Sequence, residues 1–389
     1  MQLDPAACLP ADFSDATLVG RVETKDGPCV VSIRPDGVYD LTAKAPTLSD
    51  LFNMADPVAI ARAGGPKLGE TDAIVKNSAA DQRKPGLPWL LAPCDLAALK
   101  ASGVTFVASL LERVVEEQAR GDRAAADRLR QTLGEAIGAD LSTVKPGSDS
   151  AMKLKEALIK RGAWSQYLEV GIGPDAEIFT KSQPMSAVGL GADIGVHPAS
   201  TWNNPEPEIV LAVNAAGKTV GASLGNDVNL RDVEGRSGLL LGKAKDNNAS
   251  CAIGPAVRLF DEKFSIDDVR QAHIDLTVVG DDGFKVAGGS SMSKISRDPL
   301  DLVGQTIGKH HQYPDGFMLY LGTMFAPTAD RGEPGKGFTH HVGDVVTVST
   351  PKLGALVNRV GHCDQVAPWV FGVGALMRNL AARGLILKP

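Results

Sequence analysis

The first quarter of the chain alternates hydrophobic and polar positions over short runs. The runs TLVGRVE, PCVVSIR and PDGVYDL lie between residues 17 and 42 and are separated by Asp-Gly turn signals. A period of two residues with such turns predicts small hairpins. TLSDLFNM then predicts one short helix, capped by Thr47 or Ser49. Residues 62–86 show no period and we expect a connector there, so residues 1–88 are predicted to form a small β-rich N-terminal domain.

A helical period follows over residues 108–162. DRAAADRLRQTLGEAIG carries leucine and isoleucine at i, i+4 spacing, and SDSAMKLKEALIKRG opens with Ser148 and closes with Gly162. Serine at the first position and glycine after the last are typical helix caps. We expect this segment to be a helical lid or insertion at the entrance of a second domain that spans residues 89–389. A partner-binding helical face is the alternative, although charged helix faces are most simply solvated.

From Tyr167 onward the hydrophobic runs are short strands with glycine turns. Examples are EIVLAV, TVGASLG, HIDLTVVGDDGFKV and GDVVTVST. Hairpin spacing without intervening helices favours an antiparallel or mixed sheet over a doubly wound parallel one. The predicted fold class is therefore mixed α+β and mainly β, with the helical segment between the two domains.

Composition narrows the function classes. The chain has 389 residues, 43% hydrophobic and 22% charged, which suits two globular domains. A net charge of -6 gives no electrostatic case for binding nucleic acid or an anionic membrane. No apolar run reaches the roughly 18 residues of a membrane span. The first residues lack a signal-peptide pattern, and the five cysteines form no C-x-x-C pair, so we expect a cytoplasmic protein with reduced thiols.

Two carboxylates stand at the mouth of one hydrophobic run, in WNNPEPEIVLAV. Glu206 and Glu208 are two residues apart, so on a strand they project from the same face. Two like charges held that close need a cation, a shared proton or bulk water. Pro207 between them removes a backbone donor, which indicates a strand edge or a break in pairing. Ordinary solvated charges at a strand edge remain the alternative interpretation.

A third carboxylate, Asp227, follows the next predicted strand in GNDVNLRDVEGRS. Three carboxylates from two strands are a plausible site for a hard cation, because oxygen ligands suit Mg²⁺ or Mn²⁺. The seven histidines show no zinc-ligand spacing, so zinc is disfavoured.

Three further segments carry polar side chains that can do chemistry. Lys243 and Lys245 share a face if GKAKDN is extended, and so do Glu177 and Lys181 in GPDAEIFTK if it is a strand. A lysine in a site can hold an anionic oxygen or relay a proton. In YLGTMFAP, Gly322 and Thr323 end a strand, where N–H and hydroxyl groups can bind a carboxylate.

Together these segments resemble the fumarylacetoacetate hydrolase superfamily. Its pattern is E-x-E on one strand, then an N-D-x-x-x-R-D turn, a lysine segment and G-T, and this chain has EPE, NDVNLRD, GKAKDN and GT in that order. The likeness covers roughly residues 90–385. WNNPEPE, DVNLRDVEGRS, KAKDNNASCAIGP and HQYPDGF look most like the longer dehydratase members that act on 2-keto-3-deoxy-D-pentonates of the xylonate or arabinonate type.

The resemblance implies a β-roll catalytic domain that binds one Mg²⁺ ion, with Mn²⁺ as an alternative, on Glu206, Glu208 and Asp227. It implies acid–base roles for Glu177 and Lys245, with Lys243 as the alternative lysine, and a carboxylate-binding role for Thr323. The remaining residues expected at the site are Glu112, with a catalytic role, and Lys181, Arg231, Lys243 and Ser109, which would bind substrate.

One departure from the family pattern bears on the reaction. Hydrolytic relatives carry G-x-N-Y-x-x-H-x-x-E, whose histidine and glutamate activate a water molecule. The matching stretch is GVTFVASLLE, in which Ser109 stands at the histidine position and Glu112 is retained. A serine cannot act as that base near neutral pH, so the pattern favours a lyase over a C–C hydrolase.

The function implied by the resemblance is a metal-dependent dehydratase. It would convert 2-keto-3-deoxy-D-pentonate to 2,5-dioxopentanoate in non-phosphorylative pentose catabolism. The alternatives are an acylpyruvate-type hydrolase that cleaves a 2,4-diketo acid and a catalytically silent keto-acid-binding protein. The expected partner is a small sugar acid, and relatives of this kind imply a homodimer or homotetramer.

Overall fold

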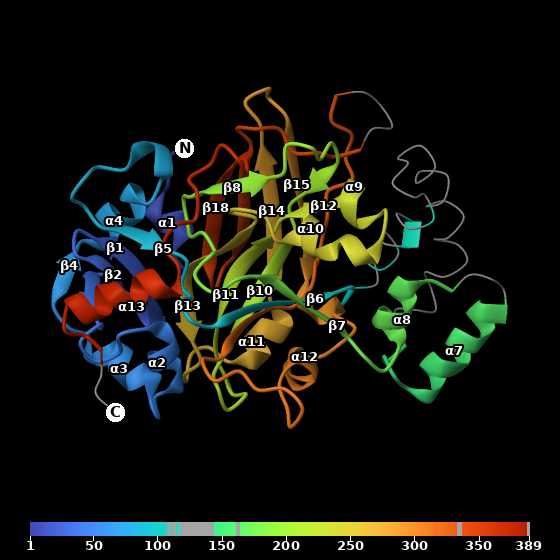
Figure 1. The fold of residues 1–389 in the computed structure, drawn as a ribbon, viewed down its shortest axis with the longest axis horizontal. Coiled ribbons are helices and arrows are strands. Elements are labelled where there is room, and N and C mark those ends of the chain that lie inside the picture. The colour runs from blue at the N-terminus through green and yellow to red at the C-terminus, as the bar shows by residue number, and fades with distance from the viewer. Residues whose placement is uncertain are drawn as a thin grey trace.

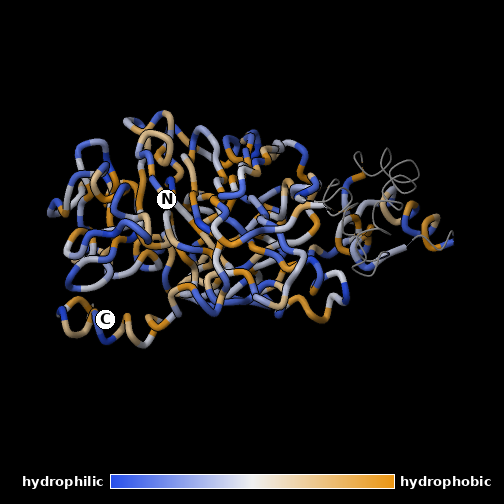
Figure 2. Tube along the Cα trace, turned by 90° about the horizontal axis from the view of Figure 1, so that it is seen from above, coloured by the Kyte–Doolittle hydropathy of each residue, from blue (hydrophilic) through white to orange (hydrophobic). Residues whose placement is uncertain are grey.

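The fold is an elongated arrangement of two β-sheets with short helices around them (Figure 1). The computed structural model describes residues 1–106, 110, 114–115, 118, 144–160, 164–332 and 337–386. The N-terminal strands lie at one end of the long axis and the helices α7 (Asp149–Lys160) and α8 (Gln166–Ile172) at the other. The view from above shows the same outline, with the C-terminus at the end opposite α7 and α8 (Figure 2).

The larger sheet runs through most of the described chain. Its order is β4 (Lys67–Gly69), β3 (Gly37–Asp40), β2 (Gly27–Arg34), β1 (Leu18–Thr24), β13 (Cys251–Leu259), β11 (Thr219–Asp227), β10 (Pro207–Val213), β16 (Phe317–Tyr320), β6 (Ala98–Gly103) and β7 (Glu177–Ser182), with β5 (Trp89–Leu91) paired to β1. Neighbouring strands are antiparallel except for β16 and β6, which run parallel. The sheet therefore joins strands from residues 1–88 to strands from the rest of the chain.

The second sheet faces the first. It is formed by β15 (Lys285–Ser291), β14 (His273–Val279), β17 (Val345–Thr350), β18 (Gly354–His362) and β8 (Asp193–Val196), in that order, and β9 (Asn203–Asn204) pairs separately with β12 (Asn229–Leu230). Only β8 and β18 run parallel in this sheet, as far as the described residues show. The predicted mixed α+β, mainly β fold is confirmed.

Strand β10 is buried on both faces and carries the main core. Ile209 and Leu211 pack between the two sheets, whereas Val210 and Ala212 pack on the opposite face. That opposite face also holds the buried residues of helix α2 (Leu48–Asn53). Because side chains alternate along a strand, Glu208 belongs to the same face as Val210.

Short helices connect and flank the strands. They are α1 (Pro5–Cys8), α3 (Pro57–Ala63), α4 (Thr71–Asn77), α9 (Arg231–Glu234), α10 (Leu241–Lys245), α11 (Ile266–Gln271), α12 (Pro299–Thr306) and α13 (Val373–Ala382), in addition to α2, α7 and α8. Thr47 caps α2 by accepting a hydrogen bond from the Asp50 amide, as predicted. Ser148 accepts one from the Ala151 amide at the start of α7. Much of the predicted helical segment 108–162 lies outside the described residues.

The prediction of an irregular connector over residues 62–86 is wrong. The structure places the end of α3, strand β4 and helix α4 there. Helix α4 buries Ile74 and Val75 in a core that it shares with the N-terminal strands. These elements are each three to seven residues long. Such short elements give too few repeats for a hydrophobic period to be read from the sequence.

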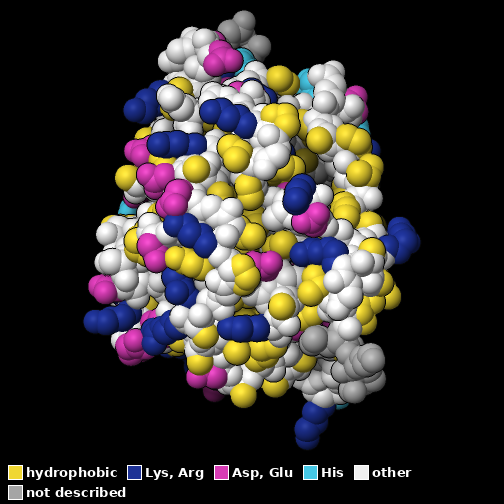
Figure 3. All heavy atoms as spheres, turned by 90° about the vertical axis from the view of Figure 1, so that its left-hand side faces the viewer, with side chains coloured by type: hydrophobic (Ala, Val, Ile, Leu, Met, Phe, Trp, Pro, Cys, Tyr) yellow, Lys and Arg dark blue, Asp and Glu magenta, His cyan; other side chains and the backbone are white. Residues whose placement is uncertain are grey.

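The predicted division near residue 88 stays a prediction, but pairing across it is extensive. Val19 of β1 pairs with Val257 of β13, so the hairpins expected between residues 17 and 42 continue the sheet that carries β10 and β11. Helix α13 lies beside these N-terminal strands (Figure 1), and its Asn379 donates a hydrogen bond to the Asp26 carbonyl. On this end of the molecule, basic and acidic side chains are interspersed among hydrophobic ones (Figure 3).

The structure also bears on the expected state of the cysteines and on membrane-spanning helices. All five cysteines are free thiols, four of them buried, as their irregular spacing indicated. None of the helices in the described part of the chain has the length and apolar character that crossing a bilayer requires.

Candidate metal centre

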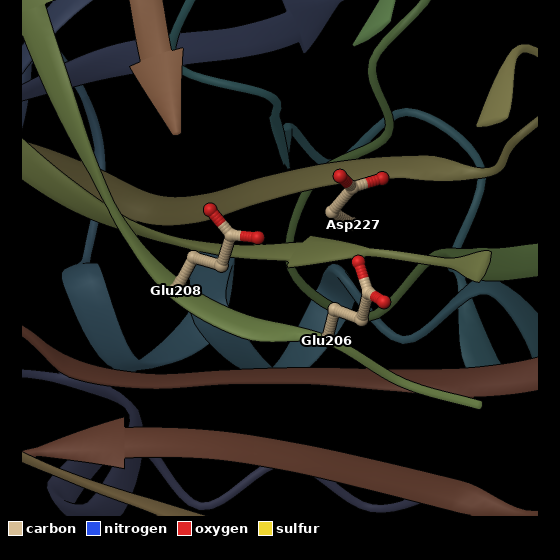
Figure 4. Close-up of side chains that lie close together, drawn as sticks. All are labelled: Glu206, Glu208 and Asp227. Carbon is tan, nitrogen blue, oxygen red and sulfur yellow. The ribbon is translucent and has the colours of Figure 1, made fainter. Parts of the chain in front are cut away.

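Strand register brings the three predicted carboxylates to one place. Glu208 of β10 pairs with Gly225 of β11, and the Asp227 amide donates to the Glu206 carbonyl at 3.0 Å. Residues opposite each other in an antiparallel pair share a face, so Asp227 stands across from Glu206. Figure 4 shows the three side chains converging from the two strands. The break in pairing expected at Pro207 is found on one side only, because β16 pairs with β10 from Val210 onward, whereas Pro207 pairs in register with Asn226 of β11.

The three carboxylates are buried, so bulk water cannot be what stabilises their like charges. Glu206, Glu208 and Asp227 are each 1% exposed, and one ligand oxygen from each lies within 4.8 Å of the others. Burial and the neighbouring charges of Asp227 and Glu206 raise the pKa of Glu208 well above its ordinary value. The interpretation as solvated strand-edge charges is therefore wrong.

Two buried lysines supply positive charge to the trio. The Lys245 ammonium contacts the Glu206 carboxylate and lies 3.1 Å from Asp227 Oδ2. Lys181 Nζ lies 3.0 Å from the other oxygen of Asp227, Oδ1. Opposite charges at this distance stabilise buried carboxylates that would otherwise be costly to keep ionised.

Lys243 and Lys245 do not share a face, because their segment is the helix α10 and not an extended run. Lys245 is 3% exposed at the end of that helix, whereas Lys243 is exposed. Residues two apart on a helix point in different directions. Of the two candidates, the structure brings only Lys245 to the carboxylates.

The Gly-Thr pair after β16 also reaches the trio. The Gly322 amide donates to Glu208 Oε2 at 2.7 Å, and Thr323 Oγ1 lies 3.4 Å from Glu208 Oε1. Gly322 has φ +98°, and a Cβ there would lie 1.9 Å from Thr105 Oγ1, so this position requires glycine. The donors that the sequence suggested for a carboxylate are thus held beside Glu208.

A small cavity adjoins the carboxylates. Its volume is about 20 Å³, room for about one water-sized guest. Its described lining is Ser102, Gly103, Val104, Tyr167, Glu177, Phe179, Glu206, Asp227, Glu234, Lys245 and Thr323. Tyr167, Glu177 and Glu234 also line a neighbouring open cavity of about 750 Å³, which is large enough for a small organic ligand. These three residues therefore lie at the boundary between the two spaces.

The position of Glu177 at this boundary depends on the residue paired with it. Gly103 of β6 is its partner across the sheet. A Cβ on Gly103 would lie 2.0 Å from Glu177 Oε2, so the carboxylate rests directly on the glycine backbone. Only a residue without a side chain leaves this space.

The remaining predicted site residues are placed differently. Lys181 is fully buried and Arg231 is 2% exposed, with its guanidinium 5.5 Å from the ring centre of Trp202. Neither contributes to the described lining of the two cavities, where substrate binding would place them. Ser109 and Glu112 lie outside the described residues.

Sequence reasoning missed Tyr167 and Glu234. Glu234 is 5% exposed and comes seven residues after Asp227, at the end of α9. Its place in NDVNLRDVEG is the one signal that pointed to it. Tyr167 is the second residue of α8, in a segment read only as the start of the strand-rich region, and no spacing connects it to the carboxylates.

The donor set fits a hard divalent cation. Three carboxylates with oxygens close together match the ligands that Mg²⁺ and Ca²⁺ prefer. Three carboxylates face two lysines, so the repulsion among the carboxylates is only partly offset. A divalent ion bound to Glu206, Glu208 and Asp227 would relieve that repulsion.

Comparison with known proteins agrees with this geometry. Residues 163–361, about half of the chain, match the family model described as fumarylacetoacetate (FAA) hydrolase C-terminal. The chain is 30% identical over 184 residues to 2-dehydro-3-deoxy-D-arabinonate dehydratase of Saccharolobus solfataricus, covering 47% of this chain and 58% of that protein. It is 29% identical over 194 residues to a probable 2-keto-3-deoxyxylonate dehydratase of Haloferax volcanii, covering 50% and 63%. The chain thus spans roughly three fifths of the length of these relatives.

Solved structures share the fold. A 2-keto-3-deoxy-D-arabinonate dehydratase in its apo form superposes with a TM-score of 0.57 at 20% identity, over 89% of this chain and 99% of that one. A structure of 2-keto-3-deoxy-D-arabinonate dehydratase complexed with magnesium and 2,5-dioxopentanoate gives a TM-score of 0.56 over the same shares, also at 20% identity. With the matched domain and the converging carboxylates, these findings show that the chain belongs to the fumarylacetoacetate hydrolase family.

Proposed function

We propose that the protein is a Mg²⁺-dependent dehydratase. Its substrate would be a 2-keto-3-deoxypentonate and its product 2,5-dioxopentanoate, as part of pentose catabolism. The two curated relatives are named for this class of substrate, and one neighbour in fold is complexed with magnesium and the proposed product. Mn²⁺ is the alternative ion, because it accepts the same oxygen ligands.

The observation that carries the proposal is that a buried acidic trio is ion-paired with Lys245. The small cavity beside them is also lined by Glu177. The trio supplies cation ligands, and Lys245 and Glu177 supply groups that can exchange protons. Both kinds of group line the same small cavity, and three of its lining residues also border the larger one. This arrangement suits a reaction in which a cation polarises a carbonyl group while nearby side chains transfer protons on the same substrate.

A divalent ion held by Glu206, Glu208 and Asp227 would polarise the C2 ketone and stabilise the negative charge that develops when a C3 proton leaves. Thr323 lines the same cavity and would hold the C1 carboxylate through its hydroxyl. The deoxy-sugar tail would then extend past Tyr167, Glu177 and Glu234 into the larger cavity. Binding of the C1 carboxylate would therefore determine which carbon atoms of the substrate lie next to Glu177.

The proton transfer from C3 is assigned to Glu177, and Lys245 is assigned the stabilisation of negative charge. Lys245 is ion-paired with two carboxylates as an ammonium group, so it has no lone pair to accept a proton. Glu177 would remove the C3 proton and pass it to the C4 hydroxyl, which leaves as water. A proton would then move from C5 to C3, and tautomerisation of the C5 enol would yield the aldehyde. Lys245 would stabilise the anionic oxygen during both steps.

The test uses purified protein with Mg²⁺ and a panel of deoxy-keto acids, with products identified by mass. We expect a loss of 18 mass units from a 2-keto-3-deoxypentonate, abolished by EDTA and by Glu206→Ala or Asp227→Ala. Cleavage of a 2,4-diketo acid without dehydration would favour the acylpyruvate-type hydrolase. Tight pyruvate binding without turnover of any candidate would favour a silent binding protein. Full dehydratase activity of metal-stripped Glu206→Ala would contradict the proposed metal role.

A further inference from the structure

We propose that Lys181 is a positioning residue that keeps Asp227 a one-oxygen metal ligand and so favours Mg²⁺ over Ca²⁺. This inference rests on the proposed metal site. It assigns to Lys181 a role behind the ligands, in place of the substrate contact expected for it. The side chain is fully buried and contributes to neither cavity in the described part of the chain.

The Lys181 ammonium is held by protein groups on all sides. It donates to the Val228 carbonyl at 3.3 Å, to Ser250 Oγ at 3.3 Å and to the Lys245 carbonyl. These three acceptors can use the three hydrogens of an ammonium group. Its ion pair with Asp227 Oδ1 at 3.0 Å comes in addition and acts as a fixed point charge.

The two oxygens of Asp227 therefore face different cations. Oδ1 is next to Lys181, which lies behind the site, whereas Oδ2 is 3.1 Å from Lys245, which lines the small cavity and also contacts Glu206. Oδ2 is thus on the side where Glu206 and the cavity are. An ion bound by the trio would meet Oδ2 first, and turning Oδ1 toward it as well would separate Oδ1 from the Lys181 charge.

This difference matters because Mg²⁺ and Ca²⁺ use carboxylates differently. Mg²⁺ demands about six ligands in a near-ideal octahedron, and Ca²⁺ takes about six to eight, often with both oxygens of one carboxylate. Three one-oxygen carboxylates leave three octahedral positions, enough for two oxygens of a 2-oxo acid and one water. A two-oxygen Asp227 would occupy one of those positions and would suit the larger ion.

The same lysine also links the ligand to the proposed catalytic lysine. Its hydrogen bond to the Lys245 carbonyl holds the end of α10, and its ion pair holds Asp227. One side chain thereby positions two groups that come from separate elements. A neutral residue could fill the space, but it could not attract Oδ1.

The test is a metal titration of Lys181→Met, a neutral side chain of similar length. Affinities for Mg²⁺ and Ca²⁺ are measured by calorimetry on metal-stripped protein, without substrate. We expect the ratio of Ca²⁺ affinity to Mg²⁺ affinity to rise by about tenfold or more, the usual scale for loss of a group behind a ligand. Lys100→Met is the matched control, because Lys100 lies on the neighbouring strand β6 and donates to Thr180, and its ratio should not change.

Ser250→Ala provides a second variant in case Lys181→Met does not fold. It removes one acceptor of the ammonium and leaves the charge in place, so a smaller shift in the same direction is expected. An unchanged ratio in the folded variants overturns the role of Lys181 while leaving the metal site standing. Failure of the wild-type protein to bind either ion would instead overturn the proposed function.

Discussion

Lys245 directs its ammonium group against the Glu206 carboxylate, one of the three proposed metal ligands. The same nitrogen lies 3.1 Å from Asp227, so this lysine contacts two ligand side chains at once. The lysine therefore offsets part of the negative charge of the two carboxylates. A divalent ion bound by the proposed ligands would have to share or displace these contacts.

The first prediction concerns Lys245→Met. Removing a competing positive charge should leave Mg²⁺ affinity intact or raise it, whereas turnover should fall by about 100-fold or more, the scale of acid–base and charge-stabilising groups. Calorimetry and a steady-state dehydratase assay give the two quantities. An unchanged rate would move the role to Lys243, and loss of metal binding would show that Lys245 mainly organises the carboxylates.

The second prediction concerns Gly103→Ala. The new methyl group would occupy the place of Glu177 Oε2 and push the carboxylate aside without removing it. We expect kcat to fall toward the value of Glu177→Gln while Mg²⁺ affinity stays unchanged, because neither change touches a ligand. The double variant should be little worse than Glu177→Gln alone. Additive losses would mean that the glycine acts independently of Glu177.

The third prediction concerns Thr323→Val. This substitution keeps the shape of the side chain and removes the hydroxyl that lies 3.4 Å from Glu208. If the hydroxyl holds the substrate carboxylate, KM should rise roughly tenfold, which corresponds to a loss of about 1.4 kcal/mol. Thr323→Ser restores the hydroxyl and should recover most of the affinity. An increase in KM that serine does not reverse would point to packing instead.

The fourth prediction concerns pH and His340. Burial lowers the pKa of this imidazole, against the opposing hydrogen bond and charge of Asp344, while Arg331 and His341 lower it further. The folded state therefore favours the neutral ring, and the unfolded chain takes up the proton first, near an ordinary histidine value of about 6.5. The free energy of unfolding should fall as the pH drops through that value.

His340→Gln tests this dependence by removing the titrating group. Denaturant unfolding between pH 7 and pH 5 should show a flatter loss of stability in this variant than in the wild type. The exposed His310→Gln serves as the control and should keep the wild-type slope. Equal slopes in all three proteins would show that His340 does not contribute to the acid sensitivity.

The carboxylate trio was predictable because it depends on local rules. The period of two along a strand placed Glu206 and Glu208 on one face, and the next strand of the hairpin returned Asp227 to them. The side-chain geometry of Lys245 was not predictable in the same way. Its segment is five residues of helix, and whether so short a stretch is helical depends on packing against the rest of the fold.

The cavity lining was the least predictable part of the site. Tyr167 and Glu234 come from separate helices, α8 and α9, and only tertiary packing brings them to the same cavity. The short elements between residues 62 and 86 were unpredictable for the same reason. Their hydrophobic residues are buried by packing against the N-terminal strands, which the local sequence does not reveal. Such contacts leave no periodic trace in a single sequence.

The continuous larger sheet has a consequence for shortened forms of the protein. Strand β13 pairs with β11 on one side and with β1 on the other, and β11 carries Asp227. Deleting residues 1–88 would strip β13 of its outer partner and leave a row of open amide and carbonyl groups one strand away from the acidic ligands. Unprotected strands of that kind recruit other chains. A protein that lacks residues 1–88 should therefore aggregate in solution and should not remain as a smaller active domain.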